Sequence, residues 1–319
     1  MNDQSFIRDR TGTWHLFSIT MKQPDDPVAA RMLDDHHWHV MSSDERKQFQ
    51  ILREKRQEKI RNGTFTPFNP LDERHLDHAT APDLHGPWTR HDFALSSDSS
   101  VGEHQLWAPF VVEHNFHYYL FYCAGGESPE TYQINLATSP DLHRWTRHKS
   151  NPLFRDGYQA RDPMVLRLAD RWLMYYTATS EASGGNHIVA FRESKDLINW
   201  GPRKIAFKDS EKGKEGGTTE SPFVLRRGRF YYLFISMRKG YQPGCYRCTD
   251  VFRSDDPRKW SLASKVGEIS AHAPEIIRDV DGRWYASHTG WWQGGTWLAP
   301  VRWNDGECEH DTSLPKPQF

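Results

Sequence analysis

The sequence predicts an all-β fold, a five-bladed β-propeller with four-stranded blades. Two observations predict it: a strand hairpin recurs four times along the chain, and a second motif that ends in Trp recurs between its copies. Repeated four-stranded sheets arranged around one axis protect their own edges, which is the principle of a propeller. We therefore expect residues 1–319 to form a single domain.

The recurring hairpin has a short apolar strand, a charged or Gly-containing turn, and a second strand rich in aromatic residues. Its copies lie at residues 108–122, 162–176, 221–234 and 273–287. Runs of β-branched and aromatic residues bounded by polar turns are typical of strands. Each copy therefore predicts two neighbouring antiparallel strands.

The second motif is a strand followed by a polar turn and a Trp. Its copies lie at residues 77–88, 136–145, 190–200 and 252–260. Together the two motifs provide about four strands for each repeat. The blades are expected to begin near residues 3, 107, 161, 219 and 272.

The first blade contains an insert at about residues 21–76. Ser43 before Asp44 and Glu45 is typical of a helix start, and Gly63 suits a helix end. We expect the insert to be partly helical. It could rim a substrate pocket, meet a second subunit, or form a solvated surface helix.

The composition favours a carbohydrate partner. Lys and Arg number 41 against 42 Asp and Glu, so no basic field is available for nucleic acid or an anionic membrane surface. Aromatic residues make up 13% of the chain, with 13 Trp, although the mean hydropathy is −0.80. Such amphipathic rings suit the flat apolar faces and hydroxyl groups of sugars.

Location and assembly are less constrained by the sequence. The first residues lack a basic segment followed by an apolar one, and no apolar run of about 18 residues occurs. A cytoplasmic location is the default expectation, although a secreted protein whose signal had been removed would look the same. The oligomeric state stays open.

In a propeller, the start of each innermost strand faces the central axis, so these residues converge. Three of them are carboxylates, one each from blades one, three and four. Glycoside hydrolysis needs one protonated carboxyl group as acid and one ionised carboxylate as nucleophile or base. The converging residues are Asp3, Trp107, Arg161, Asp162, Glu220 and His272.

Several of these motifs resemble the five-bladed clan of glycoside hydrolase families 32, 68 and 43. Residues 2–3, with Gly12 and residues 15–17 after them, resemble the family 32 opening, although Gln4 stands where that opening has Pro. Residues 161–163 and 220–222 resemble the Arg-Asp-Pro and Glu-Cys-Pro elements of the clan. Residues 107–109 and 272–275 look more like family 43.

The resemblance implies a role for each carboxylate. Asp3 would be the nucleophile or base, Asp162 the stabiliser of the transition state, and Glu220 the general acid. Asp9 is a rival to Asp3, but residues 9–12 align with the hairpin turn at residues 279–282, so we interpret Asp9 as structural. A propeller that binds sugars or protein without catalysis is the alternative reading.

Further residues are expected to contact substrate. Arg161 would bind sugar hydroxyls, Trp107 would form a subsite, and Trp291 and Trp292 would form a stacking platform unless they cap the last blade. No cofactor is required. By resemblance to family 43 arabinanases, His272 could bind an axial divalent cation such as calcium; a histidine that simply packs the channel is the alternative.

The expected activity is that of a glycosidase acting on a fructoside, arabinoside or xyloside, with transglycosylation as a related outcome. Family 32 chemistry would retain the anomeric configuration and family 43 chemistry would invert it. The mixed motifs leave the two open.

Overall fold

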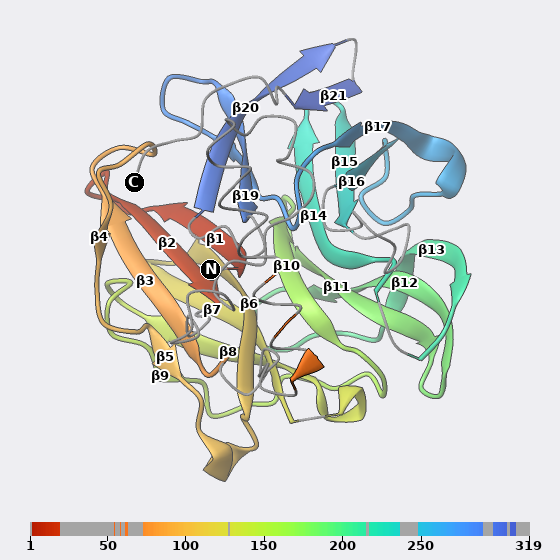
Figure 1. Cartoon of the computed structure of the whole chain (residues 1–319), viewed down its shortest axis with the longest axis horizontal. Helices are drawn as coiled ribbons and strands as arrows, with labels where there is room; N and C mark the ends of the chain where they lie inside the picture. Colours follow the sequence, from red (N-terminus) through yellow and green to blue (C-terminus); the bar gives the residue numbers. More distant parts are fainter. Residues whose placement is uncertain are drawn as a thin grey trace.

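The structure, a computed structural model, describes residues 2–19, 73–126, 128–214, 217–236, 248–289, 296–304 and 307–310, with residues 54, 58, 61 and 62. Its strands form five antiparallel sheets, each built of strands that are consecutive in the chain. The sheets surround a common centre, with β1, β6, β10 and β14 nearest to it (Figure 1), and β18 is the first strand of the fifth sheet. The predicted all-β, five-bladed propeller with four-stranded blades is confirmed.

The first sheet contains β1 (Asn2–Arg8), β2 (Trp14–Ile19), β3 (His75–Ala81), β4 (Thr89–Arg90) and β5 (Leu95–Ser96). The second contains β6 (Gln105–His114), β7 (His117–Gly125), β8 (Gln133–Ser139) and β9 (Thr146–Arg147). The third contains β10 (Arg161–Arg167), β11 (Trp172–Glu181), β12 (Gly184–Ser194) and β13 (Lys204–Lys212).

The fourth sheet contains β14 (Glu220–Arg227), β15 (Phe230–Ser236), β16 (Thr249–Ser254) and β17 (Lys265–Ile269). The fifth contains β18 (Ile276–Arg278), β19 (Trp284–Thr289), β20 (Thr296–Asn304) and β21 (Glu307–His310). Short 3₁₀ helices are η3 (Ser99–Val101), η4 (Pro129–Thr131) and η6 (Leu262–Ser264).

An apolar cluster fills each of the five junctions between blades. Between blades three and four, for example, Leu173 and Tyr175 pack with Leu233 and Phe252. These side chains alternate along their strands, so one sheet face meets the next blade, as in stacked sheets. The clusters hold the blades side by side and leave the axis to the residues at the inner strand starts.

The predicted turn at Asp9 is confirmed. The Asp9 carboxylate accepts hydrogen bonds from the backbone N–H groups of Thr11 and Thr13, and the backbone of Asp9 pairs with Thr13 and Gly12. Asp279 closes the equivalent turn in blade five with Gly282. Asp9 is thus a structural residue of a β-hairpin.

Most of the predicted insert lies outside the described residues, although residues 54, 58 and 61 are helical. In the part of the chain that the structure describes, no helix is long and apolar enough to cross a membrane.

Candidate active site

Every blade places one non-glycine residue with a left-handed backbone at the start of its innermost strand. Their φ angles are 37° at Asp3, 47° at Ala108, 58° at Asp162, 47° at Ser221 and 46° at Ala273. The register slips at this point in β1, β6, β10 and β14. Bulges of this kind redirect side chains and commonly lie beside active sites.

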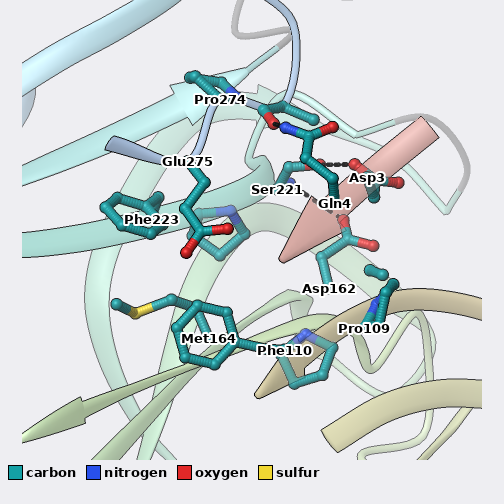
Figure 2. A pocket seen from close by; sticks show the side chains of 14 residues that line it. Asp3, Gln4, Pro109, Phe110, Asp162, Met164, Ser221, Phe223, Pro274 and Glu275 are labelled. Carbon is teal, nitrogen blue, oxygen red and sulfur yellow. Dashed lines mark hydrogen bonds between the residues drawn. The ribbon is translucent and has the colours of Figure 1, made fainter. Parts of the chain in front are cut away.

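The bulges bring the inner strand starts of all five blades around one pocket on the axis. Asp3, Asp162, Ser221 and Glu275 are among the residues that line it (Figure 2). Two of the predicted catalytic residues therefore share this pocket. Glu220 immediately precedes Ser221 and joins them through the contacts described next.

Arg161 connects Asp162 to Glu220. Its Nη1 lies 2.8 Å from Asp162 Oδ2 and 2.8 Å from Glu220 Oε1. All three side chains are largely buried, with exposed fractions of 10%, 4% and 13% respectively. Arg161 thus forms an ion pair with both carboxylates. Buried charge-assisted bonds of this kind hold both groups firmly.

Asp162 has two further donors. The backbone N–H of Ser221 donates to its Oδ2 at 3.0 Å, and the Thr177 hydroxyl donates to the same oxygen at 3.2 Å. Thr177 also donates to the carbonyl of Thr219 at 2.8 Å, which links blade three to the segment that precedes Glu220.

Asp3 joins the network from blade one. The Ser221 hydroxyl donates to Asp3 Oδ1 at 3.0 Å, a contact between residues 218 positions apart in sequence. Since the Ser221 backbone also binds Asp162, this one residue connects the two aspartates. The structure thus brings Asp3, Asp162 and Glu220 together from blades one, three and four.

The site favours protonated carboxyl groups. Burial, followed by the negative charges of Asp162 and Glu220, raises the pKa of Asp3 well above its usual value. Burial also raises the pKa of Asp162, although the Arg161 guanidinium opposes this. Glycosidases require carboxyl groups whose pKa values are displaced by their surroundings.

His272 lies beside Glu220, with its Nε2 3.9 Å from Glu220 Oε2. Burial lowers the pKa of His272 to about 3, so its ring is neutral at pH 7. A neutral imidazole can bind a metal, but calcium prefers six to eight oxygen ligands. Among the described residues, no three His, Cys, Asp or Glu side chains converge to hold a metal ion. The binding of a cation at His272, which by the resemblance would involve mostly water ligands, stays a prediction.

The predicted aromatic subsites are placed unevenly. Trp107 lies in β6 next to Ala108 and packs edge-on against Tyr132, with ring centroids 5.2 Å apart. Trp291 and Trp292 lie outside the described residues. Their substrate-binding role, like that of Arg161 and His272, stays a prediction.

Sequence patterns alone do not single out Ser221, Gln4 or Glu275, which also line the axial pocket. Ser221 follows the predicted acid, and its contacts with two aspartates depend on long-range geometry. Gln4 does depart from the expected sequence, because it replaces the Pro of the family 32 opening, but this departure does not reveal its contacts. Glu275 also departs from the repeat, because it is a charged residue directly before Ile276 and Ile277.

Comparison with known proteins places this site in a family. The family model for glycosyl hydrolases family 43 matches residues 25–306. The matched region includes Asp162, Glu220 and His272, and begins after Asp3.

Curated relatives match over part of their length. An Aspergillus flavus protein described as a probable arabinan endo-1,5-alpha-L-arabinosidase C is 27% identical over 187 residues, 56% of this chain and 56% of that protein. An Aspergillus clavatus protein of the same description is 38% identical over 181 residues, 50% of each. The chain spans about half the length of these relatives.

Solved structures share the fold. A thermostable family 43 glycoside hydrolase has a TM-score of 0.65 at 16% identity, covering 99% of this chain and 96% of the other. An endo-arabinase from Bacteroides thetaiotaomicron has a TM-score of 0.65 at 14% identity, and the match covers 96% of each chain. A family 32 beta-fructofuranosidase from Bombyx mori has a TM-score of 0.64 at 16% identity, and the match covers 98% of this chain and 62% of the other.

Proposed function

The chain belongs to glycosyl hydrolases family 43, and on that premise we propose that it hydrolyses α-L-arabinofuranosidic bonds in arabinan or its oligosaccharides. The observation that carries the proposal is the network in which Arg161 and Ser221 join three carboxylates from blades one, three and four. The choice of arabinoside over fructoside or xyloside rests on the arabinanase relatives.

Each carboxylate has a distinct task in the proposed reaction. Asp3, ionised, removes a proton from a water molecule as the water attacks the anomeric carbon. Glu220 donates its proton to the departing glycosidic oxygen. Asp162, whose ionised form the Arg161 guanidinium favours against burial, accepts hydrogen bonds from sugar hydroxyls and stabilises the positive charge that develops in the transition state.

We propose inversion of the anomeric configuration, because a water molecule and not Asp3 attacks the sugar in this scheme. The raised pKa of Asp3 supports its role as base, since a carboxylate with a higher pKa accepts a proton more readily. No step is assigned to a metal ion or cofactor.

The test is a hydrolysis screen of arabino-oligosaccharides, aryl arabinofuranosides, aryl xylosides and sucrose-type fructosides. Wild type is compared with Asp162→Asn and Glu220→Gln. Cleavage of an arabinoside by wild type, with loss in both folded variants, supports the proposal. A sugar-binding propeller without catalysis would instead bind arabino-oligosaccharides and release no product.

A further inference from the structure

The junction between blades five and one differs from the other four junctions. The chain runs directly from each blade into the next, but nothing in a linear chain connects the fifth back to the first. Each described sheet is also built of consecutive strands, so none of the strands described at one end completes the sheet at the other. Among the described residues, side-chain contacts join blade five to blade one.

Two departures from the internal repeat meet at this junction. Blade one has Gln4 after its left-handed residue, where the other blades have Pro109, Pro163, Pro222 and Pro274. Blade five has Glu275 where the blades before it have Phe110, Met164 and Phe223. In both cases a polar side chain stands where other blades have an apolar one. Both residues line the axial pocket (Figure 2).

The two side chains cross the junction in opposite directions. Gln4 Nε2 donates to the carbonyl oxygen of Ala273 at 2.8 Å and to Ser287 Oγ at 2.7 Å, both in blade five. In return, Glu275 Oε2 accepts a hydrogen bond from the backbone N–H of Phe6 in blade one, at 2.7 Å. Ser287 Oγ also accepts from the Glu275 N–H at 2.9 Å, which joins the two ties.

These ties hold the strand that carries Asp3. Gln4 is its direct neighbour and Phe6 lies three residues further along β1. The apolar cluster of the same junction, which includes Trp14, Ile277 and Tyr285, packs away from the pocket. The polar ties therefore fix the inner part of β1 to blade five, next to the carboxylate.

The tie at Glu275 suits an uncharged carboxyl group. Burial raises the pKa of Glu275 to about 8, so the group is neutral at pH 7 and one of its oxygens accepts from Phe6 as an amide oxygen would. Glutamine should therefore replace Glu275 with little loss, whereas leucine should leave the Phe6 N–H without its acceptor.

We propose that Gln4 and Glu275 are positioning residues that close the propeller between blades five and one and thereby hold Asp3 beside Ser221 and Asp162. This inference rests on the proposed function, because it assigns the closure a role in placing the base. A displaced base loses turnover even when the substrate still binds.

The test compares Gln4→Met and Glu275→Leu with the conservative Glu275→Gln. Tyr175→Phe is the matched control, since it removes another side-chain bond between blades, from Tyr175 to the Pro257 carbonyl, away from the pocket. The two disruptive variants should lower kcat at least about tenfold with KM within about twofold. Glu275→Gln and Tyr175→Phe should keep kcat, even if Tyr175→Phe unfolds at a lower temperature.

Hydrogen exchange over residues 2–8 provides a readout that does not require activity. Gln4→Met and Glu275→Leu should speed exchange in this strand while exchange in β10 and β14 stays as in wild type. If wild type cleaves none of the screened sugars, the proposed function fails and exchange alone decides the closure. Wild-type exchange in both variants, or wild-type kcat in both with an active enzyme, would overturn the inference.

Discussion

Asp3 and Asp162 occupy equivalent positions in blades one and three, yet the protein holds them differently. Both have a left-handed backbone at the start of the innermost strand. Asp162 accepts hydrogen bonds from Arg161, Thr177 and the Ser221 backbone. Among the described residues, the Asp3 carboxylate accepts a hydrogen bond from the Ser221 hydroxyl. Asp162 is 4% exposed, while Asp3 is only partly buried.

The difference teaches how one repeated position can serve two tasks. The propeller supplies the same bulge in each blade, and the neighbours of each carboxylate set its behaviour. A firmly bonded ion suits a fixed charge that stabilises a transition state. A less firmly bonded carboxyl group with a raised pKa suits a base that must meet water and take a proton.

The largest expected effect follows from removing the charge of the base. Asp3→Asn keeps the shape of the side chain and should lower kcat by about 10³-fold, within the range of general base catalysis. Steady-state kinetics on an arabinofuranoside measure this, with circular dichroism as the check on folding. A loss below about tenfold would show that Asp3 is not the base and that Asp3 and Asp162 do not divide the work as described.

Arg161→Met should have the next largest effect. It removes the cation that Asp162 and Glu220 share, so the pKa of Asp162 should rise further and less of it should be ionised. We expect kcat to fall by about 10²-fold. Because a buried carboxylate without its partner can destabilise the fold, Arg161→Lys, which keeps the charge, is measured alongside it. Equal kcat in wild type and a folded Arg161→Met would contradict the role of Arg161.

A smaller effect on rate, but a clear one on pH dependence, is expected for Ser221→Ala. The Ser221 hydroxyl lowers the pKa of Asp3 against the larger opposing effect of burial, so its loss should raise that pKa further. The acid limb of kcat/KM should then move to higher pH, since Asp3 must be ionised to accept a proton. If the acid limb of kcat/KM stays at the wild-type pH, Ser221 does not set the pKa of the base.

The smallest effect on activity is expected for Asp9→Ala, at the other end of β1. Burial acts to raise the pKa of Asp9, but hydrogen bonds from Thr11 and Thr13 outweigh it and lower that pKa. The resulting stability is present above the unfolded Asp pKa, near 4, and is lost as pH falls through the folded value. Asp9→Ala should cost about 1 kcal/mol of unfolding free energy at pH 7 and leave kcat unchanged. Urea unfolding at pH 7 and pH 3 tests it.

The blade pattern was predictable from the sequence because strand and turn signals are local. The apolar runs at residues 162–166 and 172–176, separated by a polar turn, mark a hairpin without reference to the rest of the chain, and β10 and β11 lie there. The convergence of Asp3, Asp162 and Glu220 was predictable as well, because the propeller places equivalent strand starts around one axis.

The contacts among these residues were not predictable, because they depend on backbone angles and on partners far apart in sequence. The positive φ of Asp162 and Ser221 has no mark in the sequence, since neither is glycine. The Ser221 bonds to Asp3 and Asp162, and the ties of Gln4 and Glu275, join residues from about 60 to 280 positions apart.

The most direct test of the division of labour among the carboxylates is the dependence of rate on the leaving group. Aryl arabinofuranosides with good and poor leaving groups are compared for wild type, Glu220→Gln and Asp3→Asn. An acid is needed only when the leaving group is poor, so Glu220→Gln should keep most of its rate on a dinitrophenyl substrate and lose it on a phenyl one. Asp3→Asn should lose rate on both. Equal losses of Glu220→Gln on both substrates would contradict the assignment of Glu220 as the acid.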